Sequence, residues 1–322
     1  MKKKSPIFTI IIPIHNGDST IKETFSSITK QKSLNYIKEI ILINDGSTDK
    51  SQEKIDIFKK EKKLNVKIIK HQKAKGLASS FNQAIKMAKT DFIILTHQDV
   101  ILNSNLALIK LEKIINKNRD IFYIYPIVCH PKNIWNKYNF WQKCLFSRYV
   151  NTKHYSPIEK FDCVNRQELI GIGLFDEKHF RTAGEDLDLI IRANKKKLKY
   201  ICSNIKAIHL HNKNPNFSFK DLIKKEKQLA ETKGVLLRLY GFNIPNFRSF
   251  FREVIFIALF IPKINIFATL LLIIYIIGYN WRMYLLIFQD KKVFLLPFVN
   301  LYLFLANITS STKAFLNKKQ II

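Results

Sequence analysis

Residues 40–49 read Ile-Ile-Leu-Ile-Asn-Asp-Gly-Ser-Thr-Asp, and this stretch decides the class of fold. Four consecutive aliphatic residues are typical of a strand buried on both faces, as in a parallel sheet. The polar residues that follow suit a turn and the cap of a helix. Similar apolar runs at residues 7–12, 66–70 and 92–96 alternate with helical spacing at residues 18–30, 51–60 and 77–88. This alternation predicts an α/β fold, with a parallel sheet covered by helices on both faces.

The composition excludes several classes of protein. The chain has 322 residues, of which 47% are apolar and 25% charged, so a disordered chain is excluded. Four cysteines in a chain of this size do not make a disulfide framework, and their lack of Cys-x-x-Cys spacing excludes a zinc knuckle and a redox pair. We therefore expect the protein in the reducing cytosol.

The net charge is +29 and comes mainly from dispersed lysines. No helix-turn-helix, zinc-finger or RNA-recognition motif accompanies this charge, so we expect no nucleic-acid partner. Two explanations stay open. The charge is either a solvated basic surface or attracts an anionic membrane, at about 1 kcal/mol per basic residue held close to it.

Polar loops follow three of the predicted strands. Residues 13–18, 44–49 and 97–100 read Pro-Ile-His-Asn-Gly-Asp, Asn-Asp-Gly-Ser-Thr-Asp and His-Gln-Asp-Val. Each loop by itself is ordinary turn or cap chemistry. Because binding sites of open α/β sheets lie at the carboxyl ends of the strands, the three loops together predict a functional site at that edge.

A second polar cluster lies near residue 185. Glu185 and Asp186 open a segment with helical spacing, where the helix dipole favours acidic residues. A carboxylate at a helix start beside a cavity also suits a general base. Downstream, the strand-like residues 200–208 lead to His209 and His211, which alternation places on one side. With Asp99, these histidines could supply ligands for a divalent metal.

Taken in order, these motifs resemble the family 2 glycosyltransferases of GT-A fold, over roughly residues 6–215. The GT-A fold implies a mixed, mostly parallel sheet flanked by helices. The resemblance rests on an ordered set of motifs: Pro-x-x-Asn at 13–16, Leu-Ile-Asn-Asp-Gly-Ser-Thr-Asp at 42–49, Lys-Gly-Leu-Ala-Ser-Ser-Phe-Asn at 75–82, Gln-Asp at 98–99, Gly-Leu-Phe-Asp-Glu at 173–177, Gly-Glu-Asp-x-Asp-Leu-x-x-Arg at 184–192, and His209.

The resemblance implies an inverting transfer from a nucleotide-diphosphate sugar to an acceptor hydroxyl, with Mg²⁺ or Mn²⁺ as cofactor. It implies that Asp186 is the general base and that Glu185 positions the acceptor or Asp186. Asp99 and His209, with His211 as the substitute, would bind the metal, and Asp45 would hydrogen-bond the nucleobase. The nucleotide-sugar site would comprise ten residues: Pro13, His15, Asn16, Asp45, Gly46, Lys75, Gly76, Asn82, His97 and Gln98.

Two departures from the family pattern bear on function. The family has an acidic residue two positions before Asp99, where this chain has His97, which weakens the expectation of tight metal binding. The Gln-x-x-Arg-Trp element of processive relatives is also missing, so we expect one sugar per acceptor rather than polymerisation.

The last third of the chain changes character, with apolar runs at residues 254–278 and 293–308. A membrane span needs about 20 apolar residues. We expect membrane association through a re-entrant, in-plane or hairpin anchor, with a soluble helical subdomain or dimer interface as the alternative. The predicted division is a transferase domain at residues 1–218, a basic helical linker at 219–252 and hydrophobic helices at 253–322.

We therefore expect a transferase that extends a lipid-linked or surface glycan on the cytoplasmic face of the cell membrane. One alternative is an enzyme that loads a sugar onto a polyprenyl phosphate, because a lipid acceptor fits the apolar region. Another is a non-catalytic scaffold that binds sugar nucleotides, which the histidine at position 97 favours.

Overall fold

The computed structural model describes residues 7–61, 64–211, 214–241, 251–318 and 322. The chain divides into two compact units. One unit consists of Met1–Pro131 and Asn151–Lys213, and the other of Lys132–Val150 and Asn214–Ile322. The three-part division predicted from the sequence stays a prediction, and residues 242–250 of its linker lie outside the described residues.

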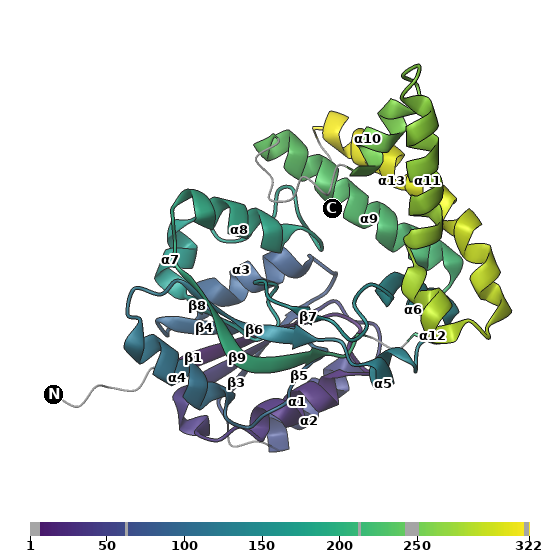
Figure 1. The fold of residues 1–322 in the computed structure, drawn as a ribbon. Coiled ribbons are helices and arrows are strands. Elements are labelled where there is room, and N and C mark those ends of the chain that lie inside the picture. Colours follow the sequence, from purple (N-terminus) through teal and green to yellow (C-terminus); the bar gives the residue numbers. More distant parts are fainter. Residues whose placement is uncertain (1–6, 62–63, 212–213, 242–250, 319–321) are drawn as a thin grey trace. The chain divides into compact units, whose positions relative to one another are not determined.

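The first unit is built on a sheet with the strand order β3-β2-β1-β4-β8-β6-β9-β5, and β7 pairs with β6 (Figure 1). The predicted strands form its parallel half: β1 (Phe8–Ile14), β2 (Ile37–Asp45), β3 (Val66–His71) and β4 (Phe92–Leu95). β1 pairs in parallel with both β2 and β4, and β2 pairs in parallel with β3. These strands therefore all end at the same edge of the sheet.

The other half of the sheet reverses direction at β8 (Asp162–Asn165), which is antiparallel to both β4 and β6 (Tyr123–Cys129). β9 (Tyr200–His209) runs parallel to β6, and β5 (Val100–Leu102) runs antiparallel to β9. The short β7 (Lys153–His154) pairs with the end of β6. Consequently, β6 and β9 end at the same edge as the parallel half, and β5 begins there.

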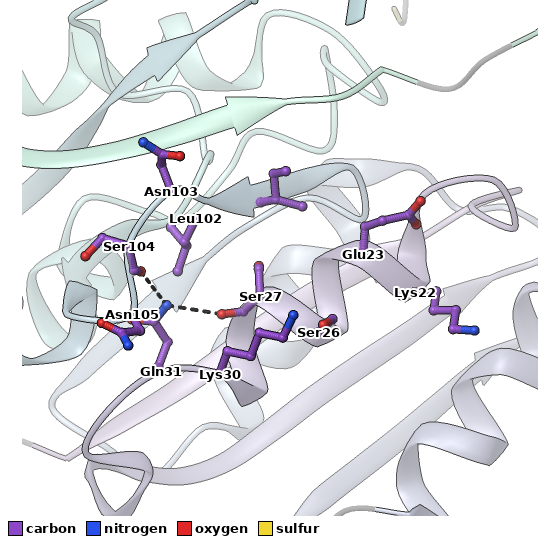
Figure 2. Close-up of a pocket in the computed structure, with 11 residues that line it drawn as sticks. Lys22, Glu23, Ser26, Ser27, Lys30, Gln31, Leu102, Asn103, Ser104 and Asn105 are labelled. Carbon is purple, nitrogen blue, oxygen red and sulfur yellow. Dashed lines mark hydrogen bonds between the residues drawn. The ribbon is translucent and has the colours of Figure 1, made fainter.

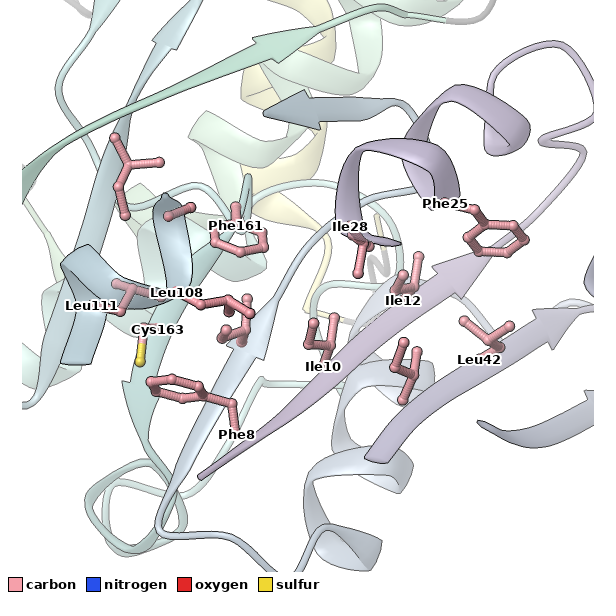
Figure 3. Packing of buried hydrophobic residues seen from close by; sticks show 14 of the residues in the cluster. Phe8, Ile10, Ile12, Phe25, Ile28, Leu42, Leu108, Leu111, Phe161 and Cys163 are labelled. Carbon is pink, nitrogen blue, oxygen red and sulfur yellow. The ribbon is translucent and has the colours of Figure 1, made fainter. Parts of the chain in front are cut away.

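Helices cover both faces of this sheet, as predicted. One core includes residues of α1 (Ile21–Thr29), α2 (Ser51–Glu61) and α4 (Ala107–Lys117), and the opposite core includes residues of α3 (Leu77–Met87), α7 (Arg166–Gly171) and α8 (Glu185–Lys195). The short helix η1 (Leu34–Tyr36) precedes β2. Because side chains alternate along a strand, Ile10 and Ile12 lie in the first core (Figure 3) and Ile11 in the second.

The second unit is helical. It contains α5 (Lys132–Trp135), α6 (Phe140–Phe146), α9 (Phe219–Tyr240), α10 (Phe251–Ala258), α11 (Asn265–Gly278), α12 (Trp281–Ile287), η3 (Lys291–Leu295) and α13 (Leu296–Leu316). α9 begins with a capping box between Ser218 and Asp221. α9 and α13 pack closely and run in the same direction, since Gly234 lies against Ser311 and Arg238 donates a hydrogen bond to Ala314 O at 2.6 Å.

Candidate active site

A cavity of about 400 Å³ opens where the parallel strands end. Its lining includes residues from all three polar loops singled out in the sequence. Twelve residues line it: Pro13, Ile14, His15, Asp45, Ala74, Gly76, Leu77, His97, Gln98, Asp99, Arg181 and Thr182. The strand order explains this convergence, because β1 lies between β2 and β4, and each loop directly follows one of these strands.

A larger cavity, of about 1010 Å³, lies between α1 and the segment that includes β5 (Figure 2). Lys22, Lys30 and Asn103 are among its lining residues, and Gln31 Nε2 donates hydrogen bonds to Ser27 O at 3.1 Å and Ser104 O at 2.7 Å. None of the site residues predicted from the sequence lines it. The smaller cavity is therefore the candidate active site.

Reciprocal hydrogen bonds join the loops after β1 and β4. His15 N donates to Gln98 Oε1 at 2.8 Å, and Gln98 Nε2 donates to His15 O at 3.0 Å. The His15 ring also donates from Nδ1 to Asp45 O at 2.7 Å, which ties in the loop after β2. Asn16 also joins the loop after β1 to the loop after β2, since its Oδ1 accepts a hydrogen bond from Thr48 N at 2.8 Å. These contacts fix the positions of the loops relative to one another.

The buried carboxylate of Asp45 holds the loop that follows β3. Its Oδ1 accepts hydrogen bonds from Lys75 N at 2.8 Å and from His71 Nδ1 at 2.7 Å. Its Oδ2 accepts one from Gly76 N at 2.8 Å. A carboxylate offers about four acceptor positions, so one remains after these three bonds. Asp45 therefore shapes one wall of the cavity and can still accept a hydrogen bond from a ligand.

Glycine is required at two points of this wall. Gly46 has φ +64°, and a Cβ there would lie 2.5 Å from Ala74 N, which is backbone and cannot yield. Gly76 has φ +104°, and a Cβ there would lie 2.5 Å from Arg181 O. This second close approach brings the segment before α8 against the start of α3, where Leu77 N donates to Arg181 O at 2.7 Å.

Four of the ten predicted nucleotide-site residues do not line the cavity: Asn16, Gly46, Lys75 and Asn82. Asn82 is buried and does not line the cavity, because its carboxamide donates to Phe175 O at 2.9 Å and Glu177 Oε1 at 2.7 Å. It holds the Gly-Leu-Phe-Asp-Glu motif against α3. Lys75 contributes its backbone to the Asp45 contacts, while its side chain is exposed.

The His-Gln-Asp loop meets a buried lysine. Lys160 Nζ donates to His97 Nδ1 at 2.9 Å, and His209 Nε2 donates to Asp99 Oδ2 at 3.1 Å. Burial lowers the pKa of His97 well below its usual range, and the charge of Lys160 lowers it further. Burial would raise the pKa of Asp99, but His209 and Lys160 outweigh it and hold that pKa far below its usual range. His97 is therefore neutral and Asp99 ionised at neutral pH.

The residues around Asp99 fit a divalent cation. Asp99 Oδ1 is buried and has no hydrogen-bond partner among the described residues, whereas Oδ2 is bonded to His209. Burial lowers the pKa of His209, so its ring is available as a neutral ligand. An ionised carboxylate with a free oxygen beside an imidazole matches the ligands that Mn²⁺ and Mg²⁺ accept.

Four carboxyl groups gather around the start of α8. Burial raises the pKa of Glu185 to about 8 and that of Asp162 to about 7. It also raises the pKa of Glu159 and Asp186, and the nearby Asp186 raises that of Glu159 further. Asp186 Oδ1 accepts a hydrogen bond from Leu187 N at 2.7 Å, and the charge of Lys160 favours its ionised form. Glu185 therefore holds a proton at neutral pH, unlike an ordinary glutamate.

Lys160, Glu159 and Asp162 were not predicted from the sequence. Glu159 and Lys160 precede β8 and Asp162 begins it, and the backbone takes φ 52° at Glu159 and φ 83° at Phe161. Left-handed backbone in residues other than glycine is uncommon and concentrates at functional sites. Arg181 was also missed, although it lies only three residues before the predicted Gly-Glu-Asp motif and lines the cavity.

Comparisons with known proteins bear on the family and the fold. The family model described as "Glycosyl transferase family 2" matches residues 9–167. The chain is 30% identical over 117 residues to glycosyltransferase GlyG of Streptococcus pneumoniae. Residues 9–167 of this chain form a glycosyl transferase family 2 domain. The chain is also 26% identical over 142 residues to the Escherichia coli UDP-Glc:alpha-D-GlcNAc-diphosphoundecaprenol beta-1,3-glucosyltransferase WfgD.

The matches to these family members are partial. They cover 36% of this chain and 38% of GlyG, and 44% of this chain and 54% of WfgD, so the chain spans about half or less of those relatives. Among solved structures, the mannosyltransferase PcManGT from Pyrobaculum calidifontis, in complex with GDP-Man and Mn²⁺, has a TM-score of 0.59 at 16% identity over 98% of this chain and 89% of that one. GalNAc-T7 with UDP, GalNAc and Mn²⁺ has a TM-score of 0.52 at 16% identity, over 79% of this chain and 55% of that one. These likenesses confirm the predicted GT-A fold.

Proposed function

We propose that this chain transfers a single sugar from a nucleotide-diphosphate donor to a hydroxyl of a lipid-linked or surface glycan, with inversion at the anomeric carbon. The acceptor oxygen bonds to the anomeric carbon, and the bond from that carbon to the diphosphate breaks with its electron pair. The observation that carries the proposal is the joint lining of one cavity by Asp45, Asp99 and Thr182, with Glu185 and Asp186 following shortly after Thr182.

The donor would occupy the cavity between the loops after β1, β2 and β4. The remaining acceptor position on Asp45 suits an N–H of the nucleobase. Arg181 lines the cavity and Lys75 lies beside it with an exposed side chain, so both can reach the diphosphate. The chemistry of the site therefore supports a nucleotide-diphosphate ligand.

Asp99 and His209 would hold a Mg²⁺ or Mn²⁺ ion, with His211 as the alternative ligand. The unpartnered Oδ1 of Asp99 supports this assignment. When bound, such an ion stabilises the negative charge of the leaving diphosphate. The structures of PcManGT and GalNAc-T7, which are similar in fold, both contain Mn²⁺.

Asp186 would be the general base and Glu185 a positioning residue. Burial raises the pKa of Asp186, which makes it a stronger base than an exposed aspartate, while Lys160 favours its ionised form. The acceptor proton would pass to this carboxylate as the acceptor oxygen attacks. Glu185 holds a proton at neutral pH because its pKa is raised to about 8, so it can donate a hydrogen bond but not accept the proton.

The test uses the full-length purified protein with uridine-, guanosine- and thymidine-diphosphate sugars and Mn²⁺. A thermal shift would identify the donor, and transfer to an undecaprenyl-diphosphate-linked sugar, the acceptor class that the name of WfgD states, would measure turnover. Asp186→Asn should lower turnover by about 10²- to 10⁴-fold while nucleotide binding changes by only a few fold. Asp120→Asn, at an exposed ion pair with Lys199, is the matched control and should leave both unchanged. Unchanged turnover in Asp186→Asn would exclude Asp186 as the base.

We further propose that the second unit lies in the plane of the membrane surface rather than crossing it. Two helical stretches, Asn265–Ile287 and Lys291–Leu316, are long and apolar enough to span a membrane. However, α13 packs along α9, in which nine of 22 residues are charged. A spanning α13 would carry these charges into lipid, where each costs about 2.5–3.5 kcal/mol at the helix centre.

The exposed apolar side chains support the in-plane arrangement. They are concentrated on α10 to α13 and include Ile266, Phe267, Leu270, Ile274, Leu285, Phe294 and Phe298. In this arrangement, cysteines placed at Lys263 and Lys291, in a cysteine-free background, should both react with an impermeant reagent from the same side of vesicles. A spanning hairpin predicts labelling from opposite sides.

A further inference from the structure

Four of the eight histidines of the chain gather at one edge of the sheet, next to Asp99. Three adjacent strands bring them together. His130 directly follows β6, His209 ends β9, and Asp99 immediately precedes β5. In the parallel pairing of β6 with β9, Cys129 lies opposite Ile208, so the next residues, His130 and His209, come side by side.

The turn after β9 adds a third ring. His211 has φ 52°, and this left-handed conformation lets its ring approach that of His209, with centroids 3.7 Å apart. The ring centroid of His130 lies 5.6 Å from that of His209 and 5.3 Å from that of His211. One ligand nitrogen from each ring lies within 4.8 Å of the other two.

One of these separations matches that of two ligands on a single ion. His211 Nε2 lies 3.3 Å from His130 Nδ1. Two nitrogens bound to one tetrahedral zinc ion, each about 2.0–2.1 Å from it, are about 3.3–3.4 Å apart. A fourth ring packs against this cluster, since His154 meets His130 edge-on with ring centroids 5.2 Å apart.

We propose that His130, His209 and His211 form a binding site for a borderline divalent metal ion such as Zn²⁺ or Co²⁺. Imidazole ligands select these ions, whereas carboxylates suit Mg²⁺ and Mn²⁺. The site therefore differs in chemistry from the one at Asp99, although the two share the His209 ring. A metal ion bound by the three histidines takes His209 away from Asp99, so this ion should inhibit sugar transfer. The expected inhibition rests on the proposed function, whereas the expected metal binding does not.

The test measures metal binding by the full-length protein in the absence of any sugar nucleotide. Titration calorimetry with Zn²⁺ should show one site per chain, and Co²⁺ should give the visible absorption of a tetrahedral, nitrogen-ligated complex. His130→Gln and His211→Gln should each weaken Zn²⁺ binding at least about tenfold. His179→Gln is the matched control, because His179 pairs with Asp176 outside the cluster and should have no effect.

Two results would overturn the proposal: absence of stoichiometric Zn²⁺ binding by the wild type, or a wild-type affinity in a folded His130→Gln variant. If a variant fails to fold, X-ray absorption at the zinc edge of the wild-type complex decides the matter. Three imidazole ligands are expected there, and fewer than two would contradict the site. Since none of these measurements uses transferase activity, a failure of the proposed function would appear only in the transfer assay.

Discussion

Asp45→Asn tests whether this carboxylate builds the wall of the cavity. In the wild type, Asp45 accepts three hydrogen bonds, from Lys75 N, Gly76 N and His71 Nδ1. An asparagine side chain has one oxygen and one NH₂ group. If its oxygen keeps the two bonds made by Oδ1, its NH₂ group faces the N–H of Gly76, so a buried donor loses its acceptor.

The size of the effect follows from these contacts. Loss of a charge-assisted hydrogen bond costs about 1.5–3 kcal/mol, and the unpaired buried N–H adds about 1–3 kcal/mol. We therefore expect the free energy of unfolding of the first unit to fall by about 3–5 kcal/mol, which lowers the Tm by roughly 10 °C in a unit of this size. Affinity for the nucleotide should fall as well, because the loop at residues 74–77 loses its anchor.

Urea denaturation and calorimetric titration with uridine and guanosine diphosphates would measure both effects. Asp49→Asn is the matched control: its carboxylate also accepts backbone hydrogen bonds, from Asp18 N at 2.9 Å and Ser51 N at 3.0 Å, but it is exposed. It should lose about 1 kcal/mol. If Asp45→Asn is no less stable than Asp49→Asn, the hydrogen-bond reasoning is wrong.

Three other outcomes are expected. Gly234→Ala should lower the free energy of unfolding of the second unit in urea by about 1–3 kcal/mol, because the new Cβ would lie 2.1 Å from Ser311 O. Gly278→Ala is the control and should not destabilise the unit, because the space around Gly278 is open. Equal effects of the two substitutions would contradict the close packing at Gly234. Asp99→Asn should abolish Mn²⁺ binding measured by electron paramagnetic resonance, and a wild-type titration curve would exclude Asp99 as a ligand. Because burial raises the pKa of Asp162 from 3.8 to about 7, the folded state binds a proton at Asp162 that the unfolded chain releases. The stability of the wild type to urea relative to Asp162→Asn should therefore fall as the pH rises from about 4 to about 7, and a rise in this difference would refute the shift.

The half of the site that the sequence predicts is the half built on parallel strands. Continuous aliphatic runs identify β1, β2 and β4, and a parallel arrangement brings the loops after them to one edge. Asp45 and Asp99 therefore could be placed at one cavity without coordinates, and both line it. Asp186 does not line that cavity, and its role as the base stays a prediction.

The other half of the site depends on features without a sequence pattern. Lys160 reaches His97 from a segment with left-handed backbone at Glu159 and Phe161, which no glycine marks. His130 follows β6, a strand interrupted by Pro126, where the pairing with β9 shifts register. A proline and a bulge remove the alternation on which strand prediction depends. β6, β8 and His130 therefore need the structure to be found, whereas the strand at residues 200–208 with His209 and His211 was predicted from the sequence.

The parallel packing of α9 against α13 has a consequence for biosynthesis. The ribosome makes α9 first, then the apolar α10 to α12, and only afterwards the helix that completes the packing. At about 5–20 residues per second, roughly 3–10 s pass between the end of α9 and the start of α13. During this interval the nascent chain presents apolar helices without their partner, so capture by a nearby lipid surface competes with aggregation while translation is still under way.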